Sequence, residues 1–248
     1  MSRKTAQRTR LDLLLVQRGL AESREKARAM IMAGLAQVDG VTVDKSGHSV
    51  PIEAVISLKK PRISYVSRGG LKLEAALNQF SVDVDGLVIL DVGASTGGFT
   101  DCLLQHGARR VVAVDVGYGQ LDWRLRQHSG VEVLEKTNIR HLRPKDVDIP
   151  IHGAVIDVSF ISLALVVPTV SMLLKNHAFI IALIKPQFEV GKGQVGKNGV
   201  VRDPKLHQEV IDRLRTVFQG LDWTVQGQIP SPLLGPKGNR EFLMHLTR

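Results

Sequence analysis

Four charged residues stand at the ends of predicted strands and helices, and their side chains could activate a hydroxyl group. Lys185 follows the apolar run FIIALI, and Asp157 follows GAVI. Lys72 falls in the first turn of a helix expected over 71–80, and Glu241 begins the run EFLMHL. A hydroxyl group is a poor nucleophile until a base removes its proton, and desolvation favours the neutral form of lysine, which can act as that base.

The elements that must position these residues alternate between strand and helix. Strands are expected over 87–93, 110–117, 131–137, 153–159, 179–185, 223–230 and 240–247, and helices over 71–80, 97–107, 120–128, 163–174 and 204–221. This alternation predicts an α/β fold with a Rossmann-like, doubly wound sheet that is mostly parallel and ends in one antiparallel strand. Such sheets bind ligands at the carboxyl edge of their strands, so the four charged residues are expected to converge there.

A glycine-rich turn, DVGASTGGF, joins the first of these strands to a helix. Gly93, Gly97 and Gly98 would let a ligand approach the backbone at the helix amino terminus. Asp115 ends the next strand, where an acid reaches ribose hydroxyls, although it could be only a strand-end or cap residue. Asp91 adds a second acid, which disfavours a pyrophosphate and tolerates a sulfonium or ammonium group. The turn therefore favours S-adenosylmethionine over NAD.

Together, the base and the cofactor predict methylation of an alcohol such as a ribose 2′-hydroxyl. Lys185 is the candidate base, and Asp157 would orient it and offset the sulfonium charge. Lys72 and Glu241 would position the ribose and a neighbouring phosphate, so that alignment supplies much of the rate. The alternative is a set of ordinary salt bridges at a sheet edge, because structural ion-pair networks also cluster.

The front of the chain is a separate, basic unit. Residues 1–62 contain 12 Lys and Arg against 6 Asp and Glu, so they hold most of the chain's net charge of +9. Two helices are expected, the first ending at Gly19 and the second between Ser23 and Gly34, followed by a hairpin in AQVDGVTV. The charge indicates a polyanionic partner, either nucleic acid or an anionic membrane surface, with a solvated basic surface as the alternative.

This order of elements, in RLDLLLVQRGLAESREKARAMIMAGLAQVDG, resembles the S4 RNA-binding module, a small α+β domain. The resemblance implies that a basic helical face grips RNA phosphates, which fixes position more than it reads sequence. The residues assigned to RNA on this basis are Arg10, Arg18, Arg24, Lys26 and Arg28. Any one of them could instead belong to a solvated surface.

The rest of the chain resembles a known enzyme family. Lys72, Asp157, Lys185 and Glu241 follow the order of the Lys-Asp-Lys-Glu tetrad of the FtsJ-like ribose 2′-O-methyltransferases. With YVSRGGLKL, DVGASTGGFTDCLLQ, DVSFISL, LIKPQFEVG and GNREF, and an S4-like module in front, the whole chain resembles the TlyA family, often labelled hemolysin A. The resemblance implies methylation of ribosomal RNA cytidines, in 16S or 23S RNA or both, with ribosomal subunits as partners.

The resemblance also implies a cofactor pocket and a division of the chain. The implied pocket residues are Gly93, Ser95, Gly97, Gly98, Asp115 and Asn138, although Asn138 could equally be a turn residue. Pro61 and the Gly69-Gly70 pair indicate a linker. We expect an S4-like domain over 1–60, a linker over 61–68 and a methyltransferase domain over 69–248, and the family's linker motif has no convincing match in KKPRIS.

Other features suggest fewer roles. The glycine-rich segment 189–204 is long and basic, so Lys192 and Lys197 could contact RNA, with a mobile surface loop as the alternative. Cys102 lies in an apolar helical pattern and is expected to be a buried hydrophobic residue. The histidines lack metal-ligand spacing, so no metal is expected.

The sequence has neither a run of ~20 apolar residues nor a signal-like start, which favours a cytoplasmic protein without a membrane span. Two rival functions remain at this point. One is a membrane-active hemolysin, and the other is a noncatalytic RNA-binding factor.

Overall fold

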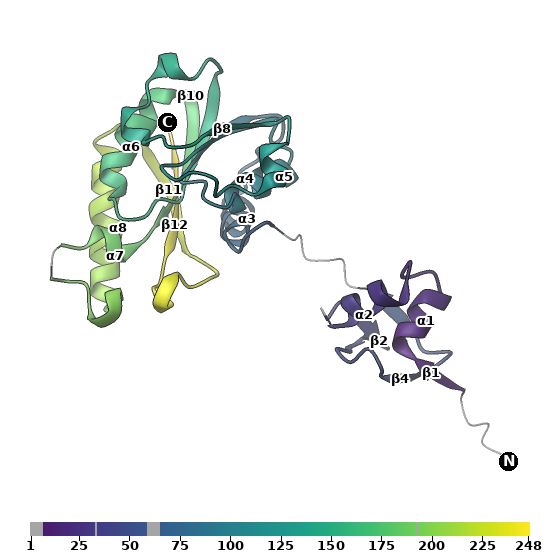
Figure 1. Cartoon of the computed structure of the whole chain (residues 1–248). Coiled ribbons are helices and arrows are strands. Elements are labelled where there is room, and N and C mark those ends of the chain that lie inside the picture. Colours follow the sequence, from purple (N-terminus) through teal and green to yellow (C-terminus); the bar gives the residue numbers. More distant parts are fainter. Residues whose placement is uncertain (1–6, 33, 59–64, 192) are drawn as a thin grey trace. The chain divides into compact units, whose positions relative to one another are not determined.

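The structure is a computed structural model in which residues 7–32, 34–58, 65–191 and 193–248 are described (Figure 1). The chain divides into two compact units, Met1–Ser64 and Tyr65–Arg248. The segment KKPRIS, at 59–64, lies outside the described residues, and it includes the first half of the expected linker, residues 61–64.

The first unit packs two short helices on small strands. Its elements are β1 (Arg8–Arg10), α1 (Leu11–Gln17), α2 (Arg24–Met32), β2 (Ala36–Val38), β3 (Val41–Thr42), β4 (Ser49–Pro51) and β5 (Ile56–Leu58). The strands form a β1-β4 pair and a three-stranded sheet in the order β3-β2-β5. The apolar faces of the two helices meet in a core that contains Leu11, Leu14 and Ile31.

Local sequence explains the boundaries of these elements. The Ser23 hydroxyl accepts a hydrogen bond from the Lys26 amide at 3.2 Å and so caps α2. Gly34, with φ +69°, follows the helix in the left-handed conformation that terminates helices. Asp39 and Gly40 both have positive φ, as the two-residue turn of a tight hairpin requires.

The second unit is built on one seven-stranded sheet. Its helices are α3 (Gly69–Phe80), α4 (Gly98–Gln105), α5 (Trp123–Arg126), α6 (Leu163–Leu173), α7 (Pro186–Glu189) and α8 (Pro204–Gln219). Its strands are β6 (Val88–Val92), β7 (Arg110–Val114), β8 (Val131–Leu134), β9 (Ile151–Ile156), β10 (Leu174–Ile184), β11 (Thr224–Pro230) and β12 (Phe242–Thr247). Short 3₁₀ turns are η1 (Ile139–His141), η2 (Pro144–Asp146), η3 (Lys197–Gly199) and η4 (Pro236–Gly238).

The strand order is β11-β12-β10-β9-β6-β7-β8, and only β12 runs antiparallel to its neighbours. From β6 the chain first adds strands on one side and then, with β9, on the other, so the sheet has a switch point between β6 and β9. The predicted doubly wound sheet with one antiparallel strand is confirmed. The expected helix over 120–128 is shorter, because α5 covers only Trp123–Arg126.

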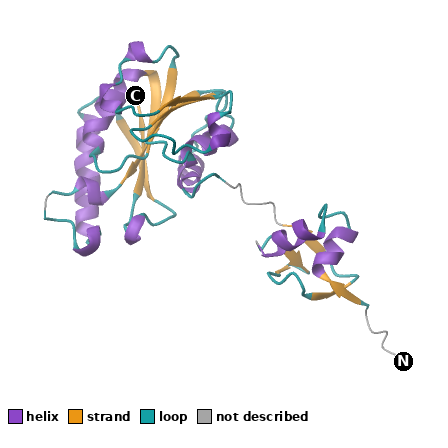
Figure 2. Ribbon diagram, in the orientation of Figure 1, coloured by secondary structure: helices purple, strands orange, loops and turns teal. Residues whose placement is uncertain are grey.

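Helices cover both faces of this sheet (Figure 2). In β10, Ile180, Ala182 and Ile184 belong to the core shared with α6 and α8. Ile181 and Leu183 belong to the core shared with α3 and α4. This alternation follows from the two-residue repeat of a strand, and it places every second residue on the α3 side. Polar residues that continue the same repeat past a strand end lie on that side too.

Two further expectations concern single features. Cys102 is fully buried in α4, and burial raises the pKa of its thiol to about 12, as expected of a buried hydrophobic residue. Among the described helices, none is both long enough and apolar enough to cross a bilayer.

Candidate active site

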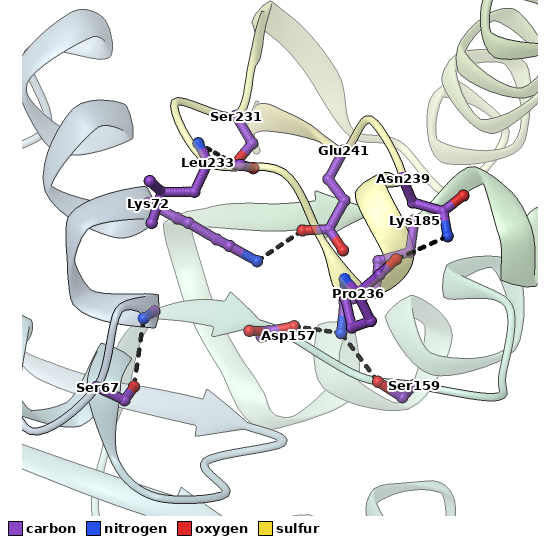
Figure 3. Close-up of polar contacts among 11 residues, drawn as sticks. Ser67, Lys72, Asp157, Ser159, Lys185, Ser231, Leu233, Pro236, Asn239 and Glu241 are labelled. Carbon is purple, nitrogen blue, oxygen red and sulfur yellow. Dashed lines mark hydrogen bonds and ion pairs between the residues drawn. The ribbon is translucent and has the colours of Figure 1, made fainter. Parts of the chain in front are cut away.

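The four charged residues predicted from the strand and helix ends come together in one cavity (Figure 3). Lys72 Nζ donates to Glu241 Oε2 at 2.6 Å. Lys185 Nζ lies 2.6 Å from Asp157 Oδ1 and donates to Ser159 Oγ at 2.9 Å. The cavity has a volume of about 390 Å³ and is lined by two lysines and two acids. Each lysine forms an ion pair with one of the acids.

The strand repeat accounts for their convergence. Asp157 stands two positions beyond Val155, and Lys185 stands two positions beyond Leu183, and both apolar residues pack on the α3 side. Glu241 stands two positions before a β12 residue of the same core. Since β12 is antiparallel, its start lies at the carboxyl edge of β9 and β10, and the side chains from these three strands lie together.

Lys72 reaches the cavity from α3, whose first turn contains no acidic residue. Close approaches at glycines hold this helix start in place. At Gly70 a Cβ atom would lie 2.2 Å from Cγ of the Tyr65 ring, and at Gly98 it would lie 2.2 Å from Ser67 Oγ. The backbone at the start of α3 therefore lies against the Tyr65 ring, and the backbone at the start of α4 lies against the Ser67 hydroxyl. Larger residues at Gly70 or Gly98 would displace the start of α3 and, with it, Lys72.

The Lys72–Glu241 pair is almost entirely withdrawn from solvent. The side chain of Lys72 is 12% exposed and that of Glu241 is 0% exposed. A buried carboxylate needs a partner, and here the lysine supplies one for Oε2. Oε1 is also buried, and it has no hydrogen-bond partner among the described residues. This oxygen is an acceptor available to a hydroxyl or amine of a bound molecule.

A second cavity of about 450 Å³ adjoins the first and shares three lining residues with it, Gly93, Ser95 and Asp157. Asp115 lines it, and the Asp115 carboxylate accepts hydrogen bonds from the Ser95 amide at 2.8 Å and the Gly117 amide at 2.7 Å. Asp115 therefore fixes the glycine-rich turn to the end of β7. Its remaining lone pairs are free for a further donor.

Gly93 brings the turn close to the chain that carries Asp157. Its φ is +86°, and a Cβ atom there would lie 2.5 Å from the Asp157 carbonyl oxygen. Apolar side chains of Ile139, Phe160 and Ile161 complete the second cavity. Each cavity has the size of a small-molecule site. The second one combines apolar walls with Asp115, an acid at the strand end where Rossmann-type sites bind ribose hydroxyls.

Not every predicted cofactor residue lines these cavities. Gly98 lines the first cavity, and Asn138 lines the second, where its side chain also caps η1. Asp91 and Gly97 line neither. A Cβ atom at Gly97 would lie 2.2 Å from Leu125 Cδ1, so this glycine serves the packing of α5. Direct contact of Asp91 or Gly97 with a cofactor stays a prediction.

Asp91 is buried beneath the glycine-rich turn. Its Oδ2 accepts from the Thr100 hydroxyl at 2.6 Å, and its Oδ1 has no hydrogen-bond partner among the described residues. Burial raises the pKa of this carboxyl to about 7, and the Thr100 hydrogen bond opposes part of that rise. The strand repeat explains its position, since the side chain of Asp91 points to the α4 side of the sheet.

Two of the predicted RNA contacts in the first unit share one buried acid. Arg10 donates to both carboxylate oxygens of Asp12, at 2.9 and 2.8 Å, and Arg24 Nε donates to Oδ2 at 3.1 Å. The Asp12 side chain is 0% exposed, whereas those of Arg10 and Arg24 are 45% and 52% exposed. The two guanidinium groups hold the pKa of Asp12 far below its usual range.

The other basic residues differ in how they are held. Arg18 donates to the carbonyl oxygens of Ala54, at 2.7 Å, and Ile52. Lys26 pairs with Glu22, four positions earlier, and the side chain of Arg28 is exposed and makes no hydrogen bond to the described residues. Lys192 lies outside the described residues, and Lys197 begins η3.

Sequence reasoning missed several residues that line the cavities or support the site. Ser159 holds the Lys185 amine, Arg68 lines the first cavity, and Phe160 lines the second. Phe160 is 89% exposed, has φ +63° and lies 4.8 Å from the Phe188 ring. Position offered a signal for Ser159 and Phe160, because they follow the strand end at Asp157.

In the described residues, no group of three His, Cys, Asp or Glu side chains is arranged to hold a metal ion.

A seven-stranded sheet of this order, with cavities at its switch point, defines the class of Rossmann-like methyltransferase folds. An S-adenosylmethionine-dependent methyltransferase of Listeria monocytogenes shares the fold, with a TM-score of 0.55 at 15% identity over 73% of this chain and 99% of that one. The family model of the FtsJ-like methyltransferases matches residues 65–248, and that of the S4 domain matches 9–56. The chain belongs to the FtsJ-like methyltransferase family.

Whole-length relatives support this assignment. The chain is 46% identical to the 16S/23S rRNA (cytidine-2′-O)-methyltransferase TlyA of Mycobacterium tuberculosis, over 97% of this chain and 90% of that protein. It is 39% identical to a protein named Hemolysin A from Brachyspira hyodysenteriae, over 95% and 98%. A hemolysin-named protein of Streptococcus thermophilus has a solved structure with a TM-score of 0.74 at 42% identity, covering 98% of this chain and 90% of that one. The predicted resemblance to S4-containing, TlyA-like methyltransferases is confirmed.

Proposed function

We propose that this protein methylates a ribose 2′-hydroxyl of ribosomal RNA with S-adenosylmethionine as the methyl donor. One observation carries the proposal: the Lys185–Asp157 pair stands where the two cavities meet, with the Lys72–Glu241 pair opposite in the first cavity. A cofactor in one cavity and a nucleotide in the other would meet at this pair. The names of the TlyA relatives, which are rRNA (cytidine-2′-O)-methyltransferases, support the same reaction and suggest cytidine as the target.

The residues of the second cavity fit S-adenosylmethionine. Asp115 stands at the end of β7, where it can accept from ribose hydroxyls, and Ile139 and Phe160 offer apolar walls for an adenine ring. Gly93 leaves the turn without a side chain at its close approach to Asp157. When bound, the cofactor supplies an electrophilic methyl group on a positively charged sulfur. The acids lining this cavity, Asp115 and Asp157, favour a cationic ligand.

Lys185 is the residue that would accept the proton of the 2′-hydroxyl. Its side chain is 11% exposed, so water competes little for the amine. In its neutral form the amine takes the proton as the ribose oxygen attacks, and Asp157 Oδ1 then stabilises the ammonium that forms. Ser159 accepts a second N–H of the same group and so fixes its direction.

The second pair would hold the nucleotide. Lys72 is a cation in the first turn of α3, a position that suits a phosphate better than it suits the helix itself. Glu241 keeps Lys72 in place through Oε2 and leaves Oε1 to accept from a hydroxyl of the ribose. Binding by these two residues would bring the sugar oxygen close to Lys185, and such orientation supplies a large part of the rate enhancement in transfer reactions.

The first unit would supply affinity for RNA. It contributes most of the excess positive charge, and Arg10 and Arg24 are fixed side by side on Asp12 with about half of each side chain exposed. Such fixed guanidinium groups suit the phosphates of folded RNA, where they set position more than sequence preference.

Methyl transfer from labelled S-adenosylmethionine into purified, unmodified 30S and 50S subunits tests the proposal. We expect label at a ribose 2′-oxygen with the wild-type protein and near-complete loss with Lys185→Ala. The matched control is Lys175→Ala, which removes an exposed lysine from the other end of the same strand and should leave the rate unchanged. Label on a base, or full transfer by Lys185→Ala, would reject the proposed mechanism.

A further inference from the structure

One buried side-chain amide joins two chain segments beside Glu241. Asn239 is 3% exposed and lies in the loop 231–241, between β11 and β12. Its Oδ1 accepts from the Val201 amide at 3.1 Å. Its Nδ2 donates to the carbonyl oxygens of Gly199 at 3.0 Å and Pro236 at 3.1 Å, the latter bond being drawn in Figure 3. Both amide protons and the amide oxygen are therefore used.

The loop that Asn239 closes surrounds the Glu241 carboxylate. The Gly235 amide donates to the Asn239 carbonyl at 2.8 Å, and the Ser231 amide donates to the Glu241 carbonyl at 2.8 Å. Gly235 lies so close to Glu241 that a Cβ atom there would be 2.0 Å from Oε1. The position of the carboxylate therefore depends on the shape of this loop, and the Asn239 side chain holds that shape.

The segment 199–201, which Asn239 bonds, is itself held in place by α8 and the sheet. Val201 is 2% exposed, and its carbonyl oxygen is 2.9 Å from His207 Nε2 in the first turns of α8. The His207 ring packs edge-on against Phe242, the first residue of β12, with 5.5 Å between ring centroids. Asn239 thus fastens the loop to a segment that is itself held by α8 and the sheet, so the loop cannot shift independently of them.

We propose that Asn239 is a positioning residue for methyl transfer, which acts by fixing Glu241 and, through it, Lys72. The inference rests on the proposed function and adds a residue outside the charged tetrad. A residue with only a structural role would lower the stability of the fold and leave the turnover of the folded enzyme unchanged. A positioning residue lowers turnover, and that loss depends on Glu241 being present to be positioned.

Asn239→Ala removes three hydrogen bonds and leaves one buried amide and two carbonyl oxygens without this partner. We expect kcat for methyl transfer to 30S or 50S subunits to fall between ~10-fold and ~10²-fold, as expected for a misplaced group near the reacting atoms. Binding of S-adenosylmethionine, measured by calorimetry, should stay within about twofold of wild type, because Asn239 lines neither cavity. The control Ser171→Ala removes a buried hydroxyl that bonds Trp223 at 2.8 Å, and it should lower Tm without changing kcat.

The double variant Asn239→Ala with Glu241→Gln separates the two roles. If Asn239 acts through Glu241, the double variant should show the residual kcat of Glu241→Gln alone. Multiplied losses, or an unchanged kcat in Asn239→Ala with a lowered Tm, would overturn the inference while the proposed function stands. A wild-type protein that transfers no methyl group to either subunit would overturn both.

Hydrogen exchange gives a readout that needs no substrate. Asn239→Ala should speed exchange at the Ser231 and Gly235 amides, which close the loop around Glu241, and Ser171→Ala should not. Unchanged protection at both amides would show that the loop keeps its shape without Asn239, which would also overturn the inference.

Discussion

The amine of Lys185 lies 2.6 Å from Oδ1 of Asp157, and Asp157 lines the two adjoining cavities of the candidate active site. The pair therefore stands between the space that suits a nucleoside cofactor and the space that holds the Lys72–Glu241 pair. In the proposed reaction, a proton leaving the substrate oxygen at this junction would pass to the Lys185 amine, and the Asp157 carboxylate would stabilise the resulting charge.

This relationship predicts that positive charge alone cannot replace Lys185. Lys185→Arg keeps a cation beside Asp157, but a guanidinium group stays protonated and cannot accept a proton. We expect methyl transfer to fall by at least ~10²-fold in single-turnover assays, with cofactor binding close to that of wild type. The matched control is Lys175→Arg at the exposed start of β10. Substantial transfer by Lys185→Arg would mean that the residue serves as an electrostatic contact and that another group takes the proton.

A substitution at Gly93 should displace Asp157 through a contact with its backbone. Gly93→Ala would place a Cβ atom 2.5 Å from the Asp157 carbonyl oxygen, so the chain that carries Asp157 must move. We expect both cofactor affinity and methyl transfer to fall at least ~10-fold, because small displacements of reacting groups are costly. Gly86→Ala carries a similar backbone strain, with φ +68°, but its Cβ atom meets nothing within 4 Å. Equal losses in the two variants would trace the effect to strain in general.

The convergence of Asp157 and Lys185 could be predicted from the sequence for a simple reason. Each follows a buried parallel strand, and all parallel strands end at one edge of a sheet. The side of the sheet was also implicit in the sequence, since each residue continues a two-residue repeat. Glu241 was predictable once the last strand was taken as antiparallel. The pairing of Lys72 with Glu241, across 169 positions, depends on the packing of α3 and had no local signal.

Three buried polar residues make contacts that the sequence analysis did not predict. Asp91 lies one position out of step with the residues that face α6 and α8, so its side chain points beneath α4 and toward Thr100. Asn239 had no signal, because its three partners belong to loops whose path depends on tertiary packing. Asp12 also had no signal as an organiser of Arg10 and Arg24, because a polar residue in an amphipathic helix is normally exposed.

Removing the negative charge of Asp12 should weaken the binding of RNA, although the loss of a negative charge normally strengthens it. Asp12→Ala makes the protein more positive, which by charge alone should strengthen RNA binding. It also frees Arg10 and Arg24 from the carboxylate that fixes them, and we expect weaker binding of ribosomal RNA, by ~3-fold to ~10-fold, for the loss of ~1 kcal/mol or slightly more. Asp44→Ala removes an exposed acid from the same unit and should bind equally well or more tightly. Filter binding at several salt concentrations measures both.

The same variant should lower the stability of the first unit by ~1–3 kcal/mol at neutral pH, because a buried, hydrogen-bonded carboxylate is lost. The folded pKa of Asp12 lies below its unfolded value of about 3.9. Its stabilising effect is therefore complete above about pH 5 and is lost as the pH falls toward the folded pKa. Urea unfolding followed by far-UV circular dichroism should show a gap between wild type and Asp12→Ala that narrows below pH 4. A gap that stays constant with pH would mean that packing, and not the charge, is what Asp12 contributes.

Asp91 predicts a pH dependence of the opposite sense in the second unit. Burial raises the pKa of its carboxyl to about 7, above the unfolded value of about 3.9. Such a group stabilises the fold fully below the unfolded pKa, and that contribution is lost as the pH rises through the folded pKa, since the folded protein then holds a buried charge. Asp91→Asn keeps an oxygen to accept the Thr100 hydrogen bond and carries no charge.

We expect the Tm of Asp91→Asn, relative to wild type, to rise by several degrees between pH 5 and pH 8, as a stabilisation of ~1 kcal/mol or more would produce. Scanning calorimetry of both proteins across this range measures the difference. A constant difference would show that Asp91 is already ionised at pH 5, and that a donor other than Thr100 supports its charge in the folded protein.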